Sequence, residues 1–78
     1  MQLSYDPRHN VAYLKFQDKQ AEVESVRVSE ALVVDLAPDG TIFGIELLDA
    51  NEQLHVTETG RLTVTNEATG KITEVAFP

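Results

Sequence analysis

The middle of the chain carries the pattern that most restricts its fold. Two stretches rich in Val, Ile and Leu, residues 32–37 and 41–48, are separated by only Pro38, Asp39 and Gly40. Proline presets φ at the first corner of a type I turn, aspartate tolerates the second corner, and glycine accepts the left-handed position that follows. The pattern therefore predicts an antiparallel β-hairpin with a three-residue loop.

A pairing of Ala37 with Thr41 sets the register expected for this hairpin. Eleven of the 18 residues from 31 to 48 are Ala, Val, Ile, Leu or Phe, so both faces are largely apolar. Such a hairpin is expected at the centre of a sheet, covered on one face by the rest of the chain and on the other by a helix, a tail or a second subunit. The predicted pairs are Leu36 with Ile42, Val34 with Gly44 and Leu32 with Glu46 on one face, and Asp35 with Phe43, Val33 with Ile45 and Ala31 with Leu47 on the other.

Shorter β patterns precede this hairpin. Leu3 and Tyr5 alternate with polar residues, residues 6–10 supply turn chemistry, and residues 11–16 form a β-rich stretch, which together predict an N-terminal hairpin. Residues 23–29 alternate with period two and predict a third strand, because β-branched valines at this period favour extended structure over helix.

The C-terminal third of the chain gives weaker signals. Residues 53–57 admit either one helical turn or a strand, and we expect at most one short helical turn near residues 50–56. Residues 61–65 and 71–77 flank a glycine-containing turn and predict a closing hairpin. Because this hairpin is short, it is expected to dock on the main sheet.

Length and composition limit the architecture to a single small domain over residues 1–78. The fold class is mainly β (β or α+β), a small antiparallel sheet built from consecutive hairpins, with residues 51–78 as a C-terminal extension that forms a β-hairpin. The chain has no cysteine, which excludes a disulfide scaffold and thiolate metal sites. Self-association is the expected source of the burial that so small a core lacks.

The charge balance restricts the partners. Thirteen acidic residues against six basic ones give a net charge of −7, which argues against binding to a phosphate backbone. Neither a membrane-spanning run nor the pattern of a signal peptide is found in the sequence, so a cytoplasmic protein without nucleic-acid or membrane partners is expected. A homodimer and a small basic protein are the partners that this composition favours.

Two carboxylates within the central hairpin are the most informative side chains. Asp35 and Glu46 each lie on an otherwise apolar strand face, where a charge needs a partner. The expected register places them on opposite faces, which argues against a shared catalytic pair and favours structural or interface roles. Asp35 is expected to accept backbone N–H bonds near the turn, and Glu46 to reach Arg27, Arg61 or Tyr13. The candidate structural or interface residues are Asp35, Gly40, Phe43, Gly44, Ile45 and Glu46.

Gly44 stands inside a strand, where glycine loses side-chain packing. A bulge or a bend over Val34 is the favoured explanation, and close approach of another backbone or a ligand is the alternative.

A second hypothesis is a small-ligand or metal-binding enzyme that uses Asp6, His9, Asp35 and Glu46. It requires these side chains to converge in one pocket. The two histidines show no metal-ligand spacing, and no catalytic, metal or cofactor residue is assigned, so no cofactor is expected. Tyr5 and Tyr13 either present a pair of hydroxyls from adjacent strands or simply pack. The residues of this alternative surface site are Tyr5, Asp6, His9, Tyr13 and Asp49.

Three segments in order carry a family resemblance. They are Tyr5-Asp6-Pro7 with Val11-Ala12-Tyr13-Leu14, then Leu32-Val33-Val34-Asp35 with Asp39-Gly40, then Gly44-Ile45-Glu46-Leu47-Leu48. Over residues 3–50, the hairpin core, the chain resembles the DUF2283 family of small, mostly bacterial proteins of unassigned function. Genes of this family often neighbour those of small basic proteins that look like toxins. The resemblance therefore implies an antitoxin-like or masking role for an acidic member.

Overall fold

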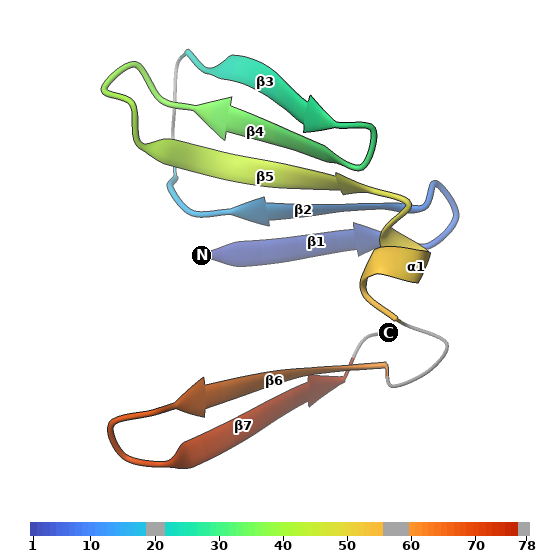
Figure 1. The fold of residues 1–78 in the computed structure, drawn as a ribbon, viewed down its shortest axis with the longest axis vertical. Helices are drawn as coiled ribbons and strands as arrows, with labels where there is room; N and C mark the ends of the chain where they lie inside the picture. Colours follow the sequence, from blue (N-terminus) through green and yellow to red (C-terminus); the bar gives the residue numbers. More distant parts are fainter. Residues whose placement is uncertain (19–21, 56–59, 77–78) are drawn as a thin grey trace.

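β-strands make up nearly all of the regular structure in residues 1–18, 22–55 and 60–76, which are the residues that the computed structural model of the chain describes (Figure 1). A single short helix follows the fifth strand. The elements are β1 (Gln2–Asp6), β2 (Val11–Lys15), β3 (Glu24–Ser29), β4 (Leu32–Leu36), β5 (Ile42–Leu48), α1 (Ala50–Gln53), β6 (Arg61–Asn66) and β7 (Lys71–Ala76). The mainly β fold class predicted from the sequence is confirmed.

The first five strands form one antiparallel sheet in the order β1-β2-β5-β4-β3. The predicted hairpins β1–β2 and β4–β5 are both present, and they join because β2 pairs with β5. Strand β5 therefore lies at the centre of the sheet, as its apolar sequence predicts.

The loop between β4 and β5 has the predicted chemistry. The N–H of Ala37 donates to the carbonyl of Thr41 at 2.8 Å, and the N–H of Gly40 donates to the carbonyl of Ala37 at 2.9 Å. Gly40 has φ of 88°, the left-handed conformation that glycine adopts at little cost. The side chain of Asp39 accepts the N–H of Thr41 at 3.0 Å and completes the turn.

Beyond this loop the register predicted for β4 and β5 is wrong. Leu36 pairs with Ile42 as expected, but a register shift between Asp35 and Leu36 then places Asp35 opposite Gly44 and Val34 opposite Ile45. A bulge sets an extra residue of one strand against its partner, and side chains alternate with period two, so a one-residue shift turns every later pair over. Asp35 and Glu46 consequently lie on the same face of the sheet.

Cross-strand pairing divides the sheet into two chemically distinct faces. The apolar face carries Leu3, Leu14, Ile45, Val34 and Val26 in one row across all five strands, and Tyr5, Ala12, Leu47 and Leu32 in the next. The polar face carries Ser4, Tyr13, Glu46, Val33 and Arg27 in one row, and Gln2, Lys15, Gly44, Asp35 and Ser25 in the next.

The sheet has little cover. The described residues include no fully buried large side chain, and the buried hydrophobic residues are all alanines: Ala12, Ala37 and Ala50. The outer residues Leu3 and Val26 of the apolar face remain 37% and 40% exposed. Among the described residues outside the sheet, α1 packs against β2 at one corner, so the expected cover of the central hairpin by the rest of the chain is not found there. Cover by a second subunit stays a prediction.

Helix α1 is the single helical turn expected near residues 50–56, and it closes one corner of the sheet. Asp49 precedes it in a left-handed conformation, with φ of 52°. The N–H of Asn51 donates to Asn10 Oδ1 at 2.7 Å, and the N–H of Ala50 donates to the carbonyl of Asn10 at 3.1 Å. The turn between β1 and β2 thus holds the start of the helix.

The C-terminal hairpin of β6 and β7 forms as predicted but does not dock on the sheet. It lies beyond the β1 edge, past α1, rather than over either face (Figure 1). All residues of both strands are exposed. The predicted docking is wrong for the described residues, and residue 77, the last of the predicted strand 71–77, lies outside them. Among the described residues, no helix has the length and apolar character needed to span a membrane.

Candidate functional site

The polar face holds a hydrogen-bonded cluster centred on Asp35. Tyr13 extends from β2 across β5, and its hydroxyl donates to Asp35 Oδ2 on β4 at 2.7 Å. From the other side, Ser25 of β3 donates to Asp35 Oδ1 at 2.6 Å. One carboxylate therefore ties together side chains from three strands. These donors are side-chain hydroxyls, not the backbone N–H groups expected from the sequence.

Gly44 makes this arrangement possible. It lies on β5 directly between Lys15 of β2 and Asp35 of β4. A Cβ at this position would fall 2.6 Å from Tyr13 Cζ and 2.8 Å from Tyr13 Cε2, closer than carbon atoms approach without displacement. A glycine is required at this position because the ring of Tyr13 crosses β5 there. The bulge that the sequence favoured is also present, as the register shift between Asp35 and Leu36 on the neighbouring strand.

The cluster raises the pKa of Tyr13 to about 12. Desolvation of the phenol is the largest cause, followed by its hydrogen bond to Asp35 and by the negative charges of Asp35 and Glu46. The hydroxyl therefore stays protonated at neutral pH and acts as a hydrogen-bond donor. It is not poised to act as a base or nucleophile, which would need a lowered pKa.

Glu46 pairs across the strands with Tyr13, one of its three expected neighbours. The other two expected partners are engaged elsewhere: Arg27 donates to the carbonyl of Ser29 at 3.0 Å, and Arg61 pairs with Glu74 at 3.2 Å. Diagonal neighbours on paired strands lie about 7–8 Å apart, which is the relation of Glu46 to Asp35. The two carboxylates thus share a face, but both oxygens of Asp35 already accept hydrogen bonds.

The turn between β1 and β2 is a separate group of charges. His9 Nδ1 lies 2.8 Å from Asp6 Oδ2, and Arg8 Nε lies 3.3 Å from Asp6 Oδ1. Hydrogen bonds from His9 and then Arg8 hold the pKa of Asp6 well below its usual range. The carboxylate also accepts the N–H of Arg8 at 2.9 Å, so its evident role is to fix the turn.

The structure does not assemble the proposed enzyme site. Asp6 pairs with Val11 at one end of the sheet, whereas Asp35 pairs with Gly44 toward the other. Within the described part of the chain, no three His, Cys, Asp or Glu side chains are placed to hold a metal ion. Asp49 lies at the start of α1 and completes no such group.

The two tyrosines do not form a joint patch. Tyr5 pairs with Ala12 on the apolar face, and its hydroxyl donates to Asn51 Oδ1 of α1. Tyr13 points to the opposite face. Neither predicted alternative holds, because residues on opposite faces of the sheet neither present their hydroxyls side by side nor pack against each other.

The remaining candidate residues belong to the central hairpin. Ile45 lies on the middle strand of the apolar face, and Gly40 forms the turn. Phe43 lies at the register shift, and its carbonyl accepts the N–H of Phe16 at 2.8 Å. Their structural or interface roles stay a prediction.

Sequence reasoning missed three polar residues that organise the molecule: Asn10, Ser25 and Asn51. Asn10 has φ of 57°, and its position at the end of a turn was a usable signal because asparagine tolerates the left-handed region. The roles of Ser25 and Asn51 depend on contacts with Asp35 and Tyr5 far along the chain, so no local pattern indicates them.

These features define a small antiparallel β-sheet protein with one apolar face, one polar face and a hydrogen-bonded polar cluster centred on Asp35. A family model described as a protein of unknown function, DUF2283, matches residues 2–51. The chain belongs to this family, which confirms the resemblance seen in the sequence. No curated protein and no solved structure is significantly similar to it. The match covers β1 to β5 and the start of α1, and β6 and β7 lie outside it.

Proposed function

We propose that this protein is an interaction module that forms a homodimer through the apolar face of its five-stranded sheet. The observation that carries the proposal is the row Leu3, Leu14, Ile45, Val34 and Val26, which crosses every strand without a polar residue. None of these side chains is fully buried. Monomeric proteins rarely expose a contiguous apolar surface of this kind, whereas interaction sites do.

The dimensions of the face suit a dimer interface. Five strands at about 4.8 Å spacing, with five residues at about 3.3 Å each, give a surface of roughly 24 Å by 17 Å. Interfaces of stable complexes bury about 800 Å² of accessible surface on each partner, so the flat area of this face, roughly 400 Å², amounts to about half of a standard interface. Burial on a second copy also supplies the core that a single chain of this length lacks.

The mass in solution tests this proposal. Val26 and Val34 pair across β3 and β4 on the apolar face, and the double substitution Val26→Thr/Val34→Thr keeps their shape and β-branching. We expect light scattering to show a dimer for the native chain and a shift toward monomer for the variant. Val33→Thr, on the polar face, is the matched control and should stay dimeric. A native chain that remains monomeric at tens of micromolar would contradict the proposal.

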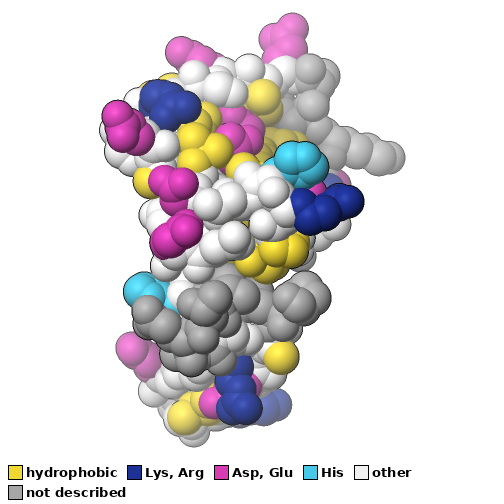
Figure 2. All heavy atoms as spheres, turned by 90° about the vertical axis from the view of Figure 1, so that its right-hand side faces the viewer, with side chains coloured by type: hydrophobic (Ala, Val, Ile, Leu, Met, Phe, Trp, Pro, Cys, Tyr) yellow, Lys and Arg dark blue, Asp and Glu magenta, His cyan; other side chains and the backbone are white. Residues whose placement is uncertain are grey.

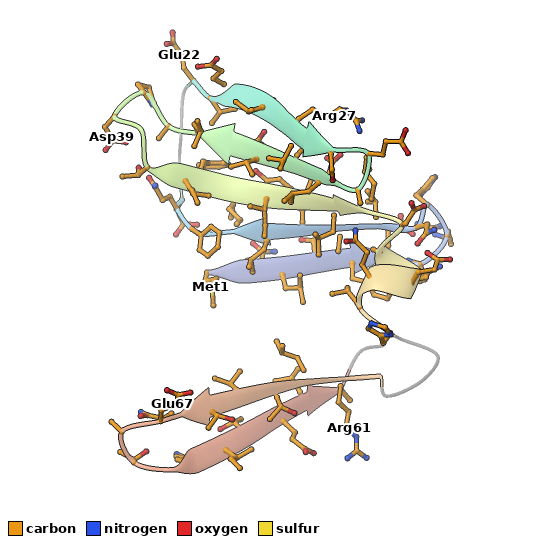
Figure 3. All side chains as sticks on the ribbon, viewed as in Figure 1. Met1, Glu22, Arg27, Asp39, Arg61 and Glu67 are labelled. Carbon is orange, nitrogen blue, oxygen red and sulfur yellow. The ribbon has the colours of Figure 1, made fainter. Side chains whose placement is uncertain are left out.

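A second role, binding to a small basic protein, is proposed from the charge. At one end of the sheet a cavity of about 310 Å³ lies between the start of β3 and the β4–β5 turn, and Glu22 and Glu24 line it beside Leu36 and Pro38. Glu22 and Asp39 both lie at this end (Figure 3). Acidic side chains also spread over other parts of the surface (Figure 2). With a net charge of −7, this surface favours a basic partner, in keeping with an antitoxin-like or masking role in the cytoplasm.

The basic-partner proposal predicts a salt-sensitive complex. Pull-down from the native cells should recover a small basic protein, and Glu24→Gln/Asp39→Asn should weaken its capture more than Glu67→Gln/Glu74→Gln on the distant hairpin. Equal capture by both variants, or no basic protein at low salt, would contradict it.

A further inference from the structure

The hairpin of β6 and β7 has an apolar side of its own. Cross-strand pairing places Leu62 opposite Val75 and Val64 opposite Thr73 on one side. Leu62, Val64 and Val75 are 44%, 54% and 53% exposed. The other side carries the Arg61–Glu74 ion pair. The other side also carries Ile72, so the hairpin is only partly amphipathic, and among the described residues no surface covers the side with Leu62, Val64 and Val75.

A two-stranded hairpin is at best marginally stable when it stands alone. This one has a regular ladder of six pairs, from Arg61 with Ala76 to Asn66 with Lys71, and it lies apart from its own sheet (Figure 1). The same chain thus has two uncovered apolar surfaces, one on the sheet and one on the hairpin. Two β-sheets can pack face to face at about 10 Å, so each of these surfaces could cover the other kind.

We infer that the hairpin of one subunit packs on the apolar face of a second copy, so that two subunits exchange their C-terminal arms. This inference rests on the proposed homodimer and specifies which surfaces meet in it. Exchange with a second copy is favoured over folding back because the hairpin extends past α1, beyond the β1 edge of its own sheet (Figure 1). Reciprocal exchange is also the closed, two-fold arrangement that most homodimers adopt.

Size and charge agree with this packing. The strands of the hairpin are six residues long, and those of the sheet are five to seven, so the lengths match. Two strands cover roughly 10 Å of the sheet's roughly 24 Å width, and the symmetric exchange doubles the buried area. Lys71 lies on the apolar side of the hairpin and Glu24 at the rim of the sheet's apolar face, which supplies opposite charges at the edge of the contact.

Crosslinking between two single-cysteine chains tests the exchange directly, since the native chain has no cysteine. One chain carries Ile45→Cys at the centre of the apolar face, and the other, tagged to differ in mass, carries Val75→Cys on the apolar side of the hairpin. A bismaleimide that spans about 10 Å matches the separation of packed sheets. We expect the mixed covalent dimer to form roughly fivefold more than with Ile72→Cys, which places the thiol on the opposite side of the same hairpin.

A second measurement uses the dimer dissociation constant. Val64→Thr should raise it at least tenfold, since the lost apolar burial counts twice in a symmetric dimer, while Ile72→Thr should leave it nearly unchanged. Two results would overturn the exchange: crosslinks that join only Ile45→Cys to itself, or a dimer that Val64→Thr does not weaken. In either case a dimer that Val26→Thr/Val34→Thr still disrupts would preserve the proposed function, so the two failures are distinguishable.

Discussion

The five-stranded sheet and the C-terminal hairpin have similar β-rich sequences but are held together differently. In the sheet, side chains connect distant strands: Tyr13 and Ser25 meet at Asp35, and Tyr5 reaches Asn51 of α1. In the described part of the hairpin, the strands are linked by the exposed Arg61–Glu74 ion pair. Alternation of apolar and polar residues is thus enough to form a ladder, but stability beyond the ladder depends on contacts that cross several strands.

Gly44→Ala should produce the largest loss of stability and should affect only the sheet. The new Cβ would collide with the ring of Tyr13, and moving the ring would break its bond to Asp35. We expect the free energy of unfolding to fall by about 2–4 kcal/mol in urea titrations. In a Tyr13→Ala background the same substitution should cost little, because the ring is gone. An equal cost in both backgrounds would show that the glycine is needed for another reason.

Asp35→Ala should have the next largest effect. It leaves the hydroxyls of Tyr13 and Ser25 without their acceptor and should lower the free energy of unfolding by about 1–3 kcal/mol, whereas Asp35→Asn retains an acceptor oxygen and should cost less.

The same substitution should lower the pKa of Tyr13 from about 12 toward the ordinary tyrosine value of 10. The folded native chain keeps this proton where the unfolded chain loses it, so its stability should fall as pH rises from 10 to 12. In Asp35→Ala the decrease in the free energy of unfolding between pH 10 and pH 12 should be smaller, because the pKa of Tyr13 differs less between the folded and unfolded chains. Phenolate absorbance, compared with Tyr13→Phe, measures the change, and an unchanged Tyr13 pKa would contradict the contribution assigned to Asp35.

A matched pair of turn glycines compares the two regions directly. Gly40 and Gly70 have φ of 88° and 76°, and neither has an atom within 4 Å of an added Cβ. Each change to alanine should therefore cost about 1–2 kcal/mol locally, from backbone strain alone. Gly40→Ala should reduce amide protection throughout β4 and β5, and Gly70→Ala only in β6 and β7, as measured by hydrogen exchange. Loss of protection in the sheet of Gly70→Ala would show that the two regions unfold together.

Arg61→Gln should have the smallest effect. The Arg61 and Glu74 side chains are 64% and 52% exposed, and exposed ion pairs contribute less than about 1 kcal/mol. Hydrogen exchange in β6 and β7 should rise slightly at low salt and match the native chain at high salt. A large, salt-independent loss would assign the arginine a packing role instead.

The sequence predicted those parts of the fold whose signals are local. The Pro38-Asp39-Gly40 loop, the central place of the second hairpin and the final hairpin all follow from turn residues and period-two alternation. The register of β4 and β5 does not follow from local signals, because the pairings with and without the bulge are nearly equal in local energy. Here the arrangement that forms places apolar Val34 opposite Ile45 and leaves Gly44 beneath Tyr13.

The candidate site shows the same division. Asp35, Gly44 and Glu46 are conspicuous in the sequence because each is unusual in an apolar strand. The sequence does not show that these three residues share a face, because that arrangement depends on the bulge. Ser25 joins the cluster only because β3 pairs with β4.

By itself the sequence determined the residue types, the turns, the strand boundaries to within a few residues and the DUF2283 resemblance. The tertiary structure decided which side chains share a face, that the sheet keeps one apolar face open, and that the C-terminal hairpin lies apart from it. The physical reason is that turns and strands depend on neighbouring residues, whereas register and docking depend on packing between segments many residues apart, where one residue of shift exchanges the two faces of a strand.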